Sequence, residues 1–328
     1  MKKVLLLCLL LCLTAGLARA QQLGQRVVVA RDGSGNYRTV QEALNAVPKN
    51  NPALITIFIK KGVYKEKLNL AKKQDNVRLV GEALEETILV YDDYNGRVVE
   101  GAAEPLGTSE AASFRVFSNN FSAENLTFQN TAAHTAGQGP AMWVYGDKAQ
   151  FRNCRFLGFR DTLYVYGYGS RQYYKNCYIE GTTDFILGSG TAWFEDCTLF
   201  CKPKGTCIMA PSTPDTVTFG FVLQRCKIVG DAPDDSYFLA RPWKPFGKAV
   251  LLNCELGPMI KPKGWDHWGK ETNKQDAFFA EFKSKGPGAA KAKQRALWSK
   301  QLNAQQAALY TPAAAMHGWD PTATPAAE

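Results

Sequence analysis

Residues 151–200 read FRNCRFLGFRDTLYVYGYGSRQYYKNCYIEGTTDFILGSGTAWFEDCTLF, and this stretch repeats itself. Its unit is an aromatic residue or Leu, a Cys three residues later and an apolar residue two residues after the Cys. Five copies follow one another at intervals of 20 to 29 residues. Each copy is too short to bury its apolar face alone, and repeats of this length are typical of stacked solenoids. The copies are Phe151-x-x-Cys154-x-Phe156, Tyr174-x-x-Cys177-x-Ile179, Phe194-x-x-Cys197-x-Leu199, Leu223-x-x-Cys226-x-Ile228 and Leu251-x-x-Cys254-x-Leu256.

These repeats predict an all-β fold, a single-stranded parallel β-helix. Asn precedes the Cys in three copies (Asn153, Asn176 and Asn253), and Asn tolerates the left-handed backbone of a tight corner between two strands. Leucine-rich repeats share the period. They require an Asn five residues after the Cys position, however, and this chain has none there.

Two acidic residues occupy equivalent places in successive repeats. Asp161 follows Cys154 by seven residues, and Asp184 follows Cys177 by the same interval. If the cysteines stack, the two aspartates stack as well, about 5 Å apart, because that is the spacing of neighbouring strands. Gln138 lies 23 residues before Asp161 and is expected in the same row, although the preceding coil, from Leu126 to Cys154, is five residues longer.

Two stacked carboxylates cannot both ionise cheaply, so one is expected to act as an acid and the other as a nucleophile. The spacing alone leaves three reactions open: retaining glycoside cleavage, ester hydrolysis by an Asp nucleophile, and calcium-assisted elimination. Aspartates that merely cap turns are the structural alternative. The chain has no G-x-S-x-G motif, only three His, and no His/Cys spacing typical of zinc, so neither a Ser-His-Asp triad nor a zinc site is predicted.

The N-terminus has the pattern of a secretory signal peptide over residues 1–20. Lys2 and Lys3 precede an apolar run from Val4 to Leu13, and Ala18-Arg19-Ala20 provides a cleavage site. No other stretch resembles a membrane span. We therefore predict export to the periplasm, the cell surface or the medium. The main domain is expected over residues 21–310, followed by a mobile tail rich in Ala, Pro and Thr over residues 311–328.

Local patterns predict several further elements. Thr39-Val40-Gln41-Glu42 is a capping box, typical of a helix start, and this helix could close one end of the solenoid. A second helix is predicted near Ala289–Leu302. Strands are predicted at Ile55–Lys60, Val77–Val80 and Ile88–Tyr91.

The formal net charge of +9 falls to +6 without Lys2, Lys3 and Arg19 of the signal peptide. An exported protein with this excess favours an acidic polymer as partner, although a solvated basic surface explains the charge equally well. No nucleic-acid-binding motif is present, so nucleic acid is excluded as a partner.

Seven of the nine cysteines lie outside the signal peptide, and five of these belong to the repeats as small core residues. Cys177 and Cys197 hold equivalent positions on successive coils and are a candidate disulfide. Cys201 and Cys207 close a short loop and are a second candidate pair.

Several sequence blocks, in a fixed order, resemble the pectinesterase family, carbohydrate esterases that remove methyl groups from pectin. The resemblance runs from about Val27 to about Tyr310 and implies a right-handed parallel β-helix. The blocks are Gly62-Val63-Tyr64-Lys65-Glu66, Asp161-Thr162-Leu163-Tyr164, Asp184-Phe185-Ile186-Leu187-Gly188, Arg241-Pro242-Trp243 and Trp265-x-x-Trp268.

The resemblance also implies a role for each matching residue. Asp184 resembles the nucleophile that attacks the ester carbonyl carbon. Asp161 resembles the acid that protonates the departing methanol and then the base that activates water. Arg241 would orient Asp184, and Gln138 would donate a hydrogen bond to the oxyanion. Substrate contacts are expected from Trp243, Tyr164, Thr108 and Trp265. Pectin or polygalacturonate is the expected partner, and a bacterial exported enzyme that acts as a monomer is the expected form. The resemblance implies no metal and no cofactor.

The chain departs from the family pattern at three places. Arg160 stands where the family usually has Gln, Ala240 replaces a usual Gly, and the block at Gln138 reads Gln-Gly-Pro-Ala-Met. Arg can donate hydrogen bonds, but its length and geometry differ from those of an amide. Two other functions therefore stay open: an esterase or thioesterase for a different acyl group, and a pectin-binding protein with little catalysis.

Overall fold

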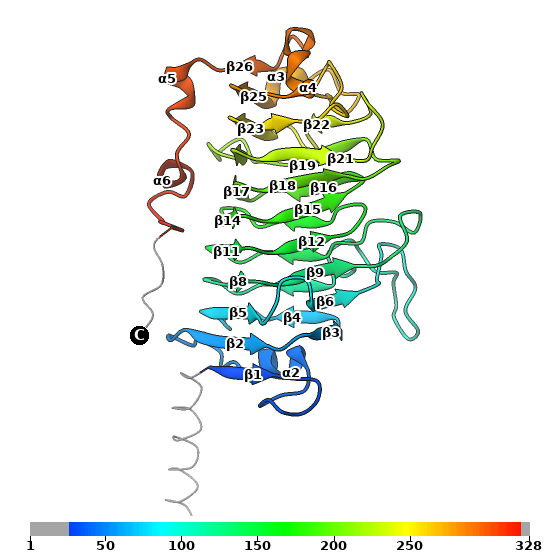
Figure 1. The fold of residues 1–328 in the computed structure, drawn as a ribbon, viewed down its shortest axis with the longest axis vertical. Helices are drawn as coiled ribbons and strands as arrows, with labels where there is room; N and C mark the ends of the chain where they lie inside the picture. Colours follow the sequence, from blue (N-terminus) through cyan, green and yellow to red (C-terminus); the bar gives the residue numbers. More distant parts are fainter. Residues whose placement is uncertain (1–25, 323–328) are drawn as a thin grey trace, which may run out of the picture.

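Parallel strands stack into three sheets that run along the whole length of the molecule (Figure 1). The computed structural model describes residues 26–322. Within this range the central coils of the chain each add one strand to each sheet in turn, and neighbouring strands of successive coils pair in parallel. The predicted right-handed parallel β-helix is confirmed.

The three sheets have eleven, seven and eight strands among the described residues. The eleven-stranded sheet contains β1 (Val27–Val29), β2 (Ile55–Ile59), β5 (Val77–Gly81), β8 (Ser122–Glu124), β11 (Ala149–Arg152), β14 (Arg171–Lys175), β17 (Thr191–Glu195), β20 (Phe221–Gln224), β23 (Lys248–Leu252), β25 (Phe278–Phe282) and β26 (Lys300–Gln301). The seven-stranded sheet contains β4 (Leu68–Leu70), β7 (Phe114–Val116), β10 (Met142–Val144), β13 (Leu163–Val165), β16 (Thr183–Gly188), β19 (Cys207–Pro211) and β22 (Phe238–Ala240). The eight-stranded sheet contains β3 (Gly62–Lys65), β6 (Thr87–Tyr91), β9 (Thr127–Asn130), β12 (Arg155–Leu157), β15 (Tyr178–Gly181), β18 (Thr198–Cys201), β21 (Lys227–Gly230) and β24 (Glu255–Leu256).

The sequence repeats form the core between these sheets. Phe151 pairs in register with Tyr174, and Tyr174 pairs with Phe194. Their rings stack at centroid distances of 4.9 and 4.7 Å, with interplanar angles of 4° and 12°. On the next sheet Phe156 pairs with Ile179. All five residues are fully buried, so the apolar stacking that the repeats predict is what fills the solenoid.

The corners before the repeat cysteines have the predicted left-handed backbone. The φ angles of Asn153, Asn176 and Asn253 are 49°, 52° and 55°. The two copies without Asn make the same corner with Asp196 and Arg225, each at φ 54°. Arg rarely adopts this region, which indicates that the stacking of the coils, and not the corner residue alone, determines the backbone there.

The N-terminal end is closed by α2 (Val40–Asn45), as predicted. Thr39 accepts a hydrogen bond from the Glu42 N–H, and the Glu42 side chain accepts one from the Thr39 N–H, which completes the capping box. The helix buries Val40 and Leu44 against the first coils. The three predicted strands correspond to β2, β5 and β6.

The predicted helix near Ala289–Leu302 is wrong. This segment instead contains α4 (Pro287–Ala290), a 3₁₀ turn at Ala292–Gln294 and β26. Its buried Arg295 pairs with Glu281 at 2.7 Å and donates to three backbone carbonyls. These contacts hold the chain in a non-helical path. The short helices α3 (Asn273–Asp276) and α5 (Ala304–Ala307) lie in the same C-terminal region.

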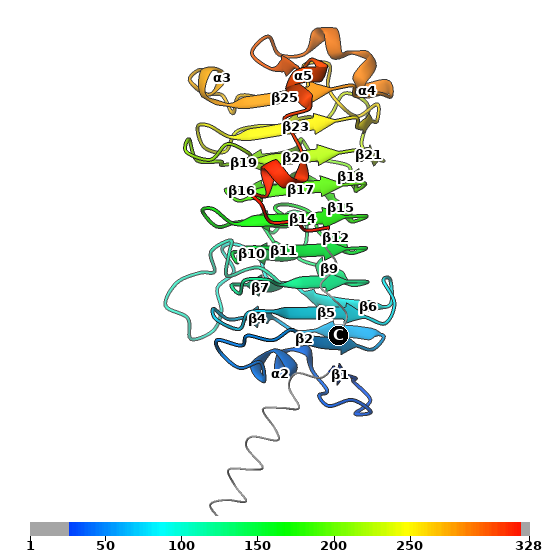
Figure 2. The same cartoon turned by 90° about the vertical axis from the view of Figure 1, so that its left-hand side faces the viewer.

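The C-terminal segment differs from the predicted mobile tail, because residues 311–322 pack on the outer face of the eleven-stranded sheet (Figure 2). Ala315 and Met316, at the end of α6 (Pro312–Ala315), are fully buried beside Tyr173 and Trp193. These two rings project outward from β14 and β17 and provide an apolar surface for the segment. Both residues 323–328 and the predicted signal peptide, residues 1–20, lie outside the described residues.

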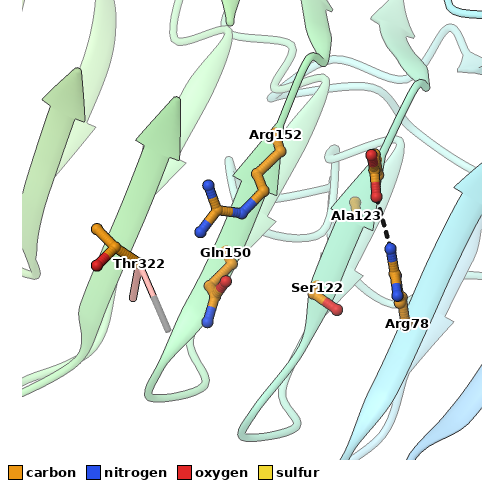
Figure 3. Close-up of a pocket in the computed structure, with 7 residues that line it drawn as sticks. Arg78, Ser122, Ala123, Gln150, Arg152 and Thr322 are labelled. Atoms are coloured by element: carbon orange, nitrogen blue, oxygen red, sulfur yellow. Dashed lines mark hydrogen bonds and ion pairs between the residues drawn. The ribbon is translucent and has the colours of Figure 1, made fainter. Parts of the chain in front are cut away.

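Beyond α6 the segment reaches a shallow hollow of about 250 Å³ on the same sheet face (Figure 3). Gln150 and Arg152 of β11 and Thr322 line this hollow. The ion pair between Arg78 and Glu124, at 2.7 Å, lies at its other side. This hollow contains none of the predicted site residues.

All seven described cysteines are buried free thiols, so the predicted Cys177–Cys197 bridge and the Cys201–Cys207 pair are not formed. The Cys177 sulfhydryl donates to the Phe151 carbonyl, and that of Cys197 donates to the Tyr174 carbonyl, both at 3.5 Å. Each of these two thiols is therefore hydrogen-bonded to the backbone of the previous coil, and burial raises the pKa of both.

We expect a thiol reagent such as Ellman's reagent to leave the seven described thiols of the native protein unmodified, because all of them are buried. After unfolding in denaturant without reductant, all seven should react. Two thiols missing from the unfolded total would reveal a disulfide and contradict the free-thiol arrangement.

Candidate active site

A pocket of about 170 Å³ opens on the outer face of the seven-stranded sheet. It brings together every predicted site residue except Trp265, although these residues come from positions far apart in the sequence. Its lining consists of Thr108, Gln138, Arg160, Asp161, Tyr164, Asp184, Leu187, Ala210, Arg241, Trp243 and Trp268.

Strand register places the two aspartates at the same level on neighbouring coils. Leu163 of β13 pairs with Ile186 of β16, and Arg160 forms an isolated parallel bridge with Thr183. Asp161 and Asp184 both have left-handed backbone, with φ angles of 61° and 51°. The pairing of β16 with β19 shifts between Thr183 and Ile186, an irregularity that includes Asp184 and interrupts the ladder at the site. The predicted stacking of the two aspartates is therefore what the register produces.

The two carboxyl groups have different surroundings. Asp161 is buried, and this desolvation, followed by the negative charge of Asp184, raises the pKa of Asp161 to about 8, although Arg160 and Arg241 oppose the rise. Asp184 instead forms a bidentate ion pair with Arg241, with Nε–Oδ1 and Nη2–Oδ2 distances of 2.8 and 2.5 Å. The site can thus present a protonated acid beside an ion-paired carboxylate.

Arg241 is itself held on two sides. Its backbone N–H donates to the Met209 carbonyl at 3.0 Å, directly after β22. The ring of Trp268 lies over its guanidinium, 3.9 Å from ring centroid to Cζ. Trp268 has a left-handed backbone, φ 56°, and its N–H donates to the Asp266 carboxylate at 2.6 Å.

The predicted substrate contact from Trp265 is wrong, and Trp268 takes the place in the pocket. Trp265 bridges to Ala240 in register, is fully buried, and packs against Phe279 at 5.0 Å. The Trp265-x-x-Trp268 motif contained both residues, but only the turn at Asp266 decides which ring faces the pocket.

Gln138 reaches the pocket by a different route from the one predicted. The coils at β10 and β13 are offset by 21 residues, because Met142 pairs with Leu163. Pro140, and not Gln138, is therefore level with Asp161. Gln138 lies two residues earlier, and its side chain still lines the pocket. Its Oε1 accepts a hydrogen bond from Asn95 Nδ2 at 3.0 Å, a contact that no pattern in the sequence predicts.

Arg160 lines the pocket beside Asp161, and its Nε is buried without a hydrogen-bond partner among the described residues. A buried donor that lacks a partner costs free energy, about 1–3 kcal/mol or more for a charged group. Because Arg160 also lines the pocket, its guanidinium group is a candidate donor to a ligand oxygen.

Aromatic rings continue the pocket into a surface row. Tyr164 and Trp243, the two rings predicted to contact substrate, meet edge to face at 6.1 Å, and both line the pocket. Trp143 and Tyr166 extend the row over the neighbouring strands and stack at 5.3 Å. Thr108 reaches the pocket from the long connection between β6 and β7. Such rings suit the apolar faces of sugar residues.

Residues 26–322 contain no group of three or more His, Cys, Asp and Glu side chains that could hold a metal ion. In the same range no helix is long and apolar enough to cross a membrane.

Comparison with solved structures finds the same architecture. A pectin methylesterase from carrot superimposes with a TM-score of 0.81 at 31% identity, over 89% of this chain and 93% of that chain. A pectin methylesterase in complex with a hexasaccharide gives a TM-score of 0.81 at 30% identity, over 90% of this chain and 98% of that chain.

Sequence comparison agrees. Pectinesterase 31 of Arabidopsis thaliana is 36% identical over 279 residues, which cover 84% of this chain and 87% of that relative. Other curated plant relatives are longer, and this chain spans about half of their length. The pectinesterase family model matches residues 26–318, so the chain belongs to the pectinesterase family.

Proposed function

We propose that this protein hydrolyses the methyl esters of pectin, releasing methanol and leaving free carboxylates on the polygalacturonate chain. The observation that carries the proposal is the pair of coil-related aspartates, one protonated by burial and one paired with Arg241. They lie in a pocket bordered by aromatic rings, on a chain of the pectinesterase family.

In the proposed first step, the Asp184 carboxylate attacks the ester carbonyl carbon and forms a tetrahedral oxyanion. The Gln138 amide and the Arg160 guanidinium are the donors available to that oxyanion. Asp161 transfers its proton to the methoxy oxygen as the carbon–oxygen bond breaks, and methanol leaves. The product is an anhydride between Asp184 and the substrate carboxyl group.

In the proposed second step, Asp161, now a carboxylate, removes a proton from water that attacks the anhydride. The carbon–oxygen bond to Asp184 breaks, and the substrate leaves as a carboxylic acid that ionises in solution. Asp161 is again protonated and Asp184 is again paired with Arg241. This cycle needs no metal and no cofactor.

The proposal includes export and a monomeric form. Residues 1–20 support export by their signal-peptide pattern. Mass spectrometry of the secreted protein, with an N-terminus at Gln21, and size-exclusion chromatography at the mass of one chain are the measurements that test these two points.

We expect Asp184→Asn and Asp161→Asn each to lower methanol release from methylated polygalacturonate by about 10²–10⁴-fold, since each removes one reacting group without a change of volume. Asp234→Asn, at an exposed position outside the pocket, is the matched control and should keep full activity. Near wild-type release by either pocket variant would reject the role of that residue. Polymer binding without methanol release by the unaltered protein would favour a binding function, and release only from other acyl esters would favour a related esterase.

Arg160 should influence both turnover and its pH dependence. Because Asp161 must donate a proton, kcat/KM should fall as pH rises above about 8, the pKa to which burial raises this group. Arg160 lowers the pKa of Asp161, so Arg160→Gln should move this alkaline decline to higher pH while keeping most turnover. Arg160→Ala should cost about 10²–10³-fold, the usual effect of one lost oxyanion donor.

Turnover and apparent KM at two salt concentrations check this role of Arg160. The control is Arg155→Gln, outside the pocket, which should leave the pH profile unchanged. If Arg160→Ala kept its turnover and only its KM rose, by an amount that depends on the salt concentration, the guanidinium would bind the acidic polymer instead of the oxyanion.

A further inference from the structure

Asn95 makes two hydrogen bonds to Gln138 from the long connection between β6 and β7. Its backbone N–H donates to the Gln138 carbonyl at 2.8 Å, and its side-chain Nδ2 donates to Gln138 Oε1 at 3.0 Å. Asn95 itself does not line the pocket.

The side-chain bond determines which end of the Gln138 amide is free. A carboxamide has one accepting oxygen and one donating NH₂ group. Since Asn95 occupies the oxygen, Nε2 is the end left without a partner among residues 26–322. If the amide were rotated by half a turn, its oxygen would be free instead, and two oxygens would then meet when a negative charge develops in the pocket.

Asn95 is held in place by its neighbours. The buried carboxylate of Asp93 pairs with Lys67 and, at 2.7 Å, with Arg97. On the other side, a Cβ on Gly137 would lie 2.9 Å from the Asn95 carbonyl, so the missing side chain there permits the close approach. The connection is thus fixed on both sides of Asn95.

We propose that Asn95 is a positioning residue that fixes the Gln138 amide with its NH₂ group toward the reacting centre before substrate binds. The inference rests on the proposed ester hydrolysis, in which Gln138 donates to the oxyanion. A donor oriented in advance does not have to rotate during the reaction, which is the condition under which such donors are most effective.

A purely structural role for Asn95 makes a different forecast. Loosening of the connection would shift Thr108 together with Gln138 and would raise KM. Such loosening would also change the kinetics in a Gln138→Ala background, in which residue 138 has no amide. A positioning role acts on kcat through the Gln138 side chain alone.

The test measures kcat and KM for Asn95→Ala and Asn95→Asp in the native background and in a Gln138→Ala background. Loss of one neutral hydrogen bond should lower kcat about 3- to 10-fold in Asn95→Ala, with KM nearly unchanged. Asn95→Asp can only accept, so it draws Nε2 away from the pocket and should lower kcat about 10²-fold. In the Gln138→Ala background neither substitution should change kcat by more than about 2-fold.

Arg97→Ala is the matched control, because it weakens the anchor of the same connection without touching Gln138. It should not reproduce the loss of kcat. Equal losses from Asn95→Asp in both backgrounds would overturn the proposal, because the substitution would then act through its charge or through the connection. Wild-type kcat in Asn95→Asp would overturn it as well.

An NMR measurement tests the orientation without substrate. In the native protein the Gln138 side-chain NH₂ signals, assigned by their loss in Gln138→Ala, should show fast exchange with water. In Asn95→Asp one of these hydrogens should move downfield and exchange more slowly. Identical signals in the two proteins would refute the positioning role, whether or not the unaltered protein releases methanol from pectin. A failure to release methanol would by itself refute only the proposed function.

Discussion

In-register stacking of parallel strands is the constraint on which the rest of the structure depends. Phe151, Tyr174 and Phe194 stack ring on ring, and this fixes how each coil lies on the next. A slip of one residue would turn every inward side chain outward. The same register carries around the coil and places Asp161 level with Asp184. The same strand register therefore determines both the packing of the core and the positions of the two aspartates.

Stacking alone would give two equivalent aspartates, and the surroundings make them different. Arg241, two coils further along the chain, pairs with only one of them. Burial then acts on the other, whose proton is retained near neutral pH. Desolvation and a single guanidinium are thus sufficient to give two residues of the same type different protonation states, which the proposed division into acid and nucleophile requires.

The repeat frame predicted the fold and the aspartate pair, because both depend on spacings within nearly equal coils. Features that depend on coils of unequal length were harder to predict from the sequence. Gln138 is displaced by two residues because its coil is offset by 21 and not 23 residues. Trp268, and not the predicted Trp265, lines the pocket because the turn at Asp266 decides which of the two rings faces outward. The packing of Met316 depends on outward rings of distant strands, a long-range contact that no local pattern reveals.

Asp161, just before β13, and Asp184 of β16 lie well inside the seven-stranded sheet, with β4, β7 and β10 on one side and β19 and β22 on the other. In a solenoid each coil contacts only its neighbours, so local opening starts at the ends and progresses inward. Fraying of the first coils has to pass three strands of this sheet before it reaches Asp161. From the opposite end the margin is smaller, because Arg241 follows β22, the last strand of this sheet. The strands and short helices that follow β22 thus lie between Arg241 and the C-terminal end of the solenoid, and early unfolding there would inactivate the protein while most of its coils were still intact.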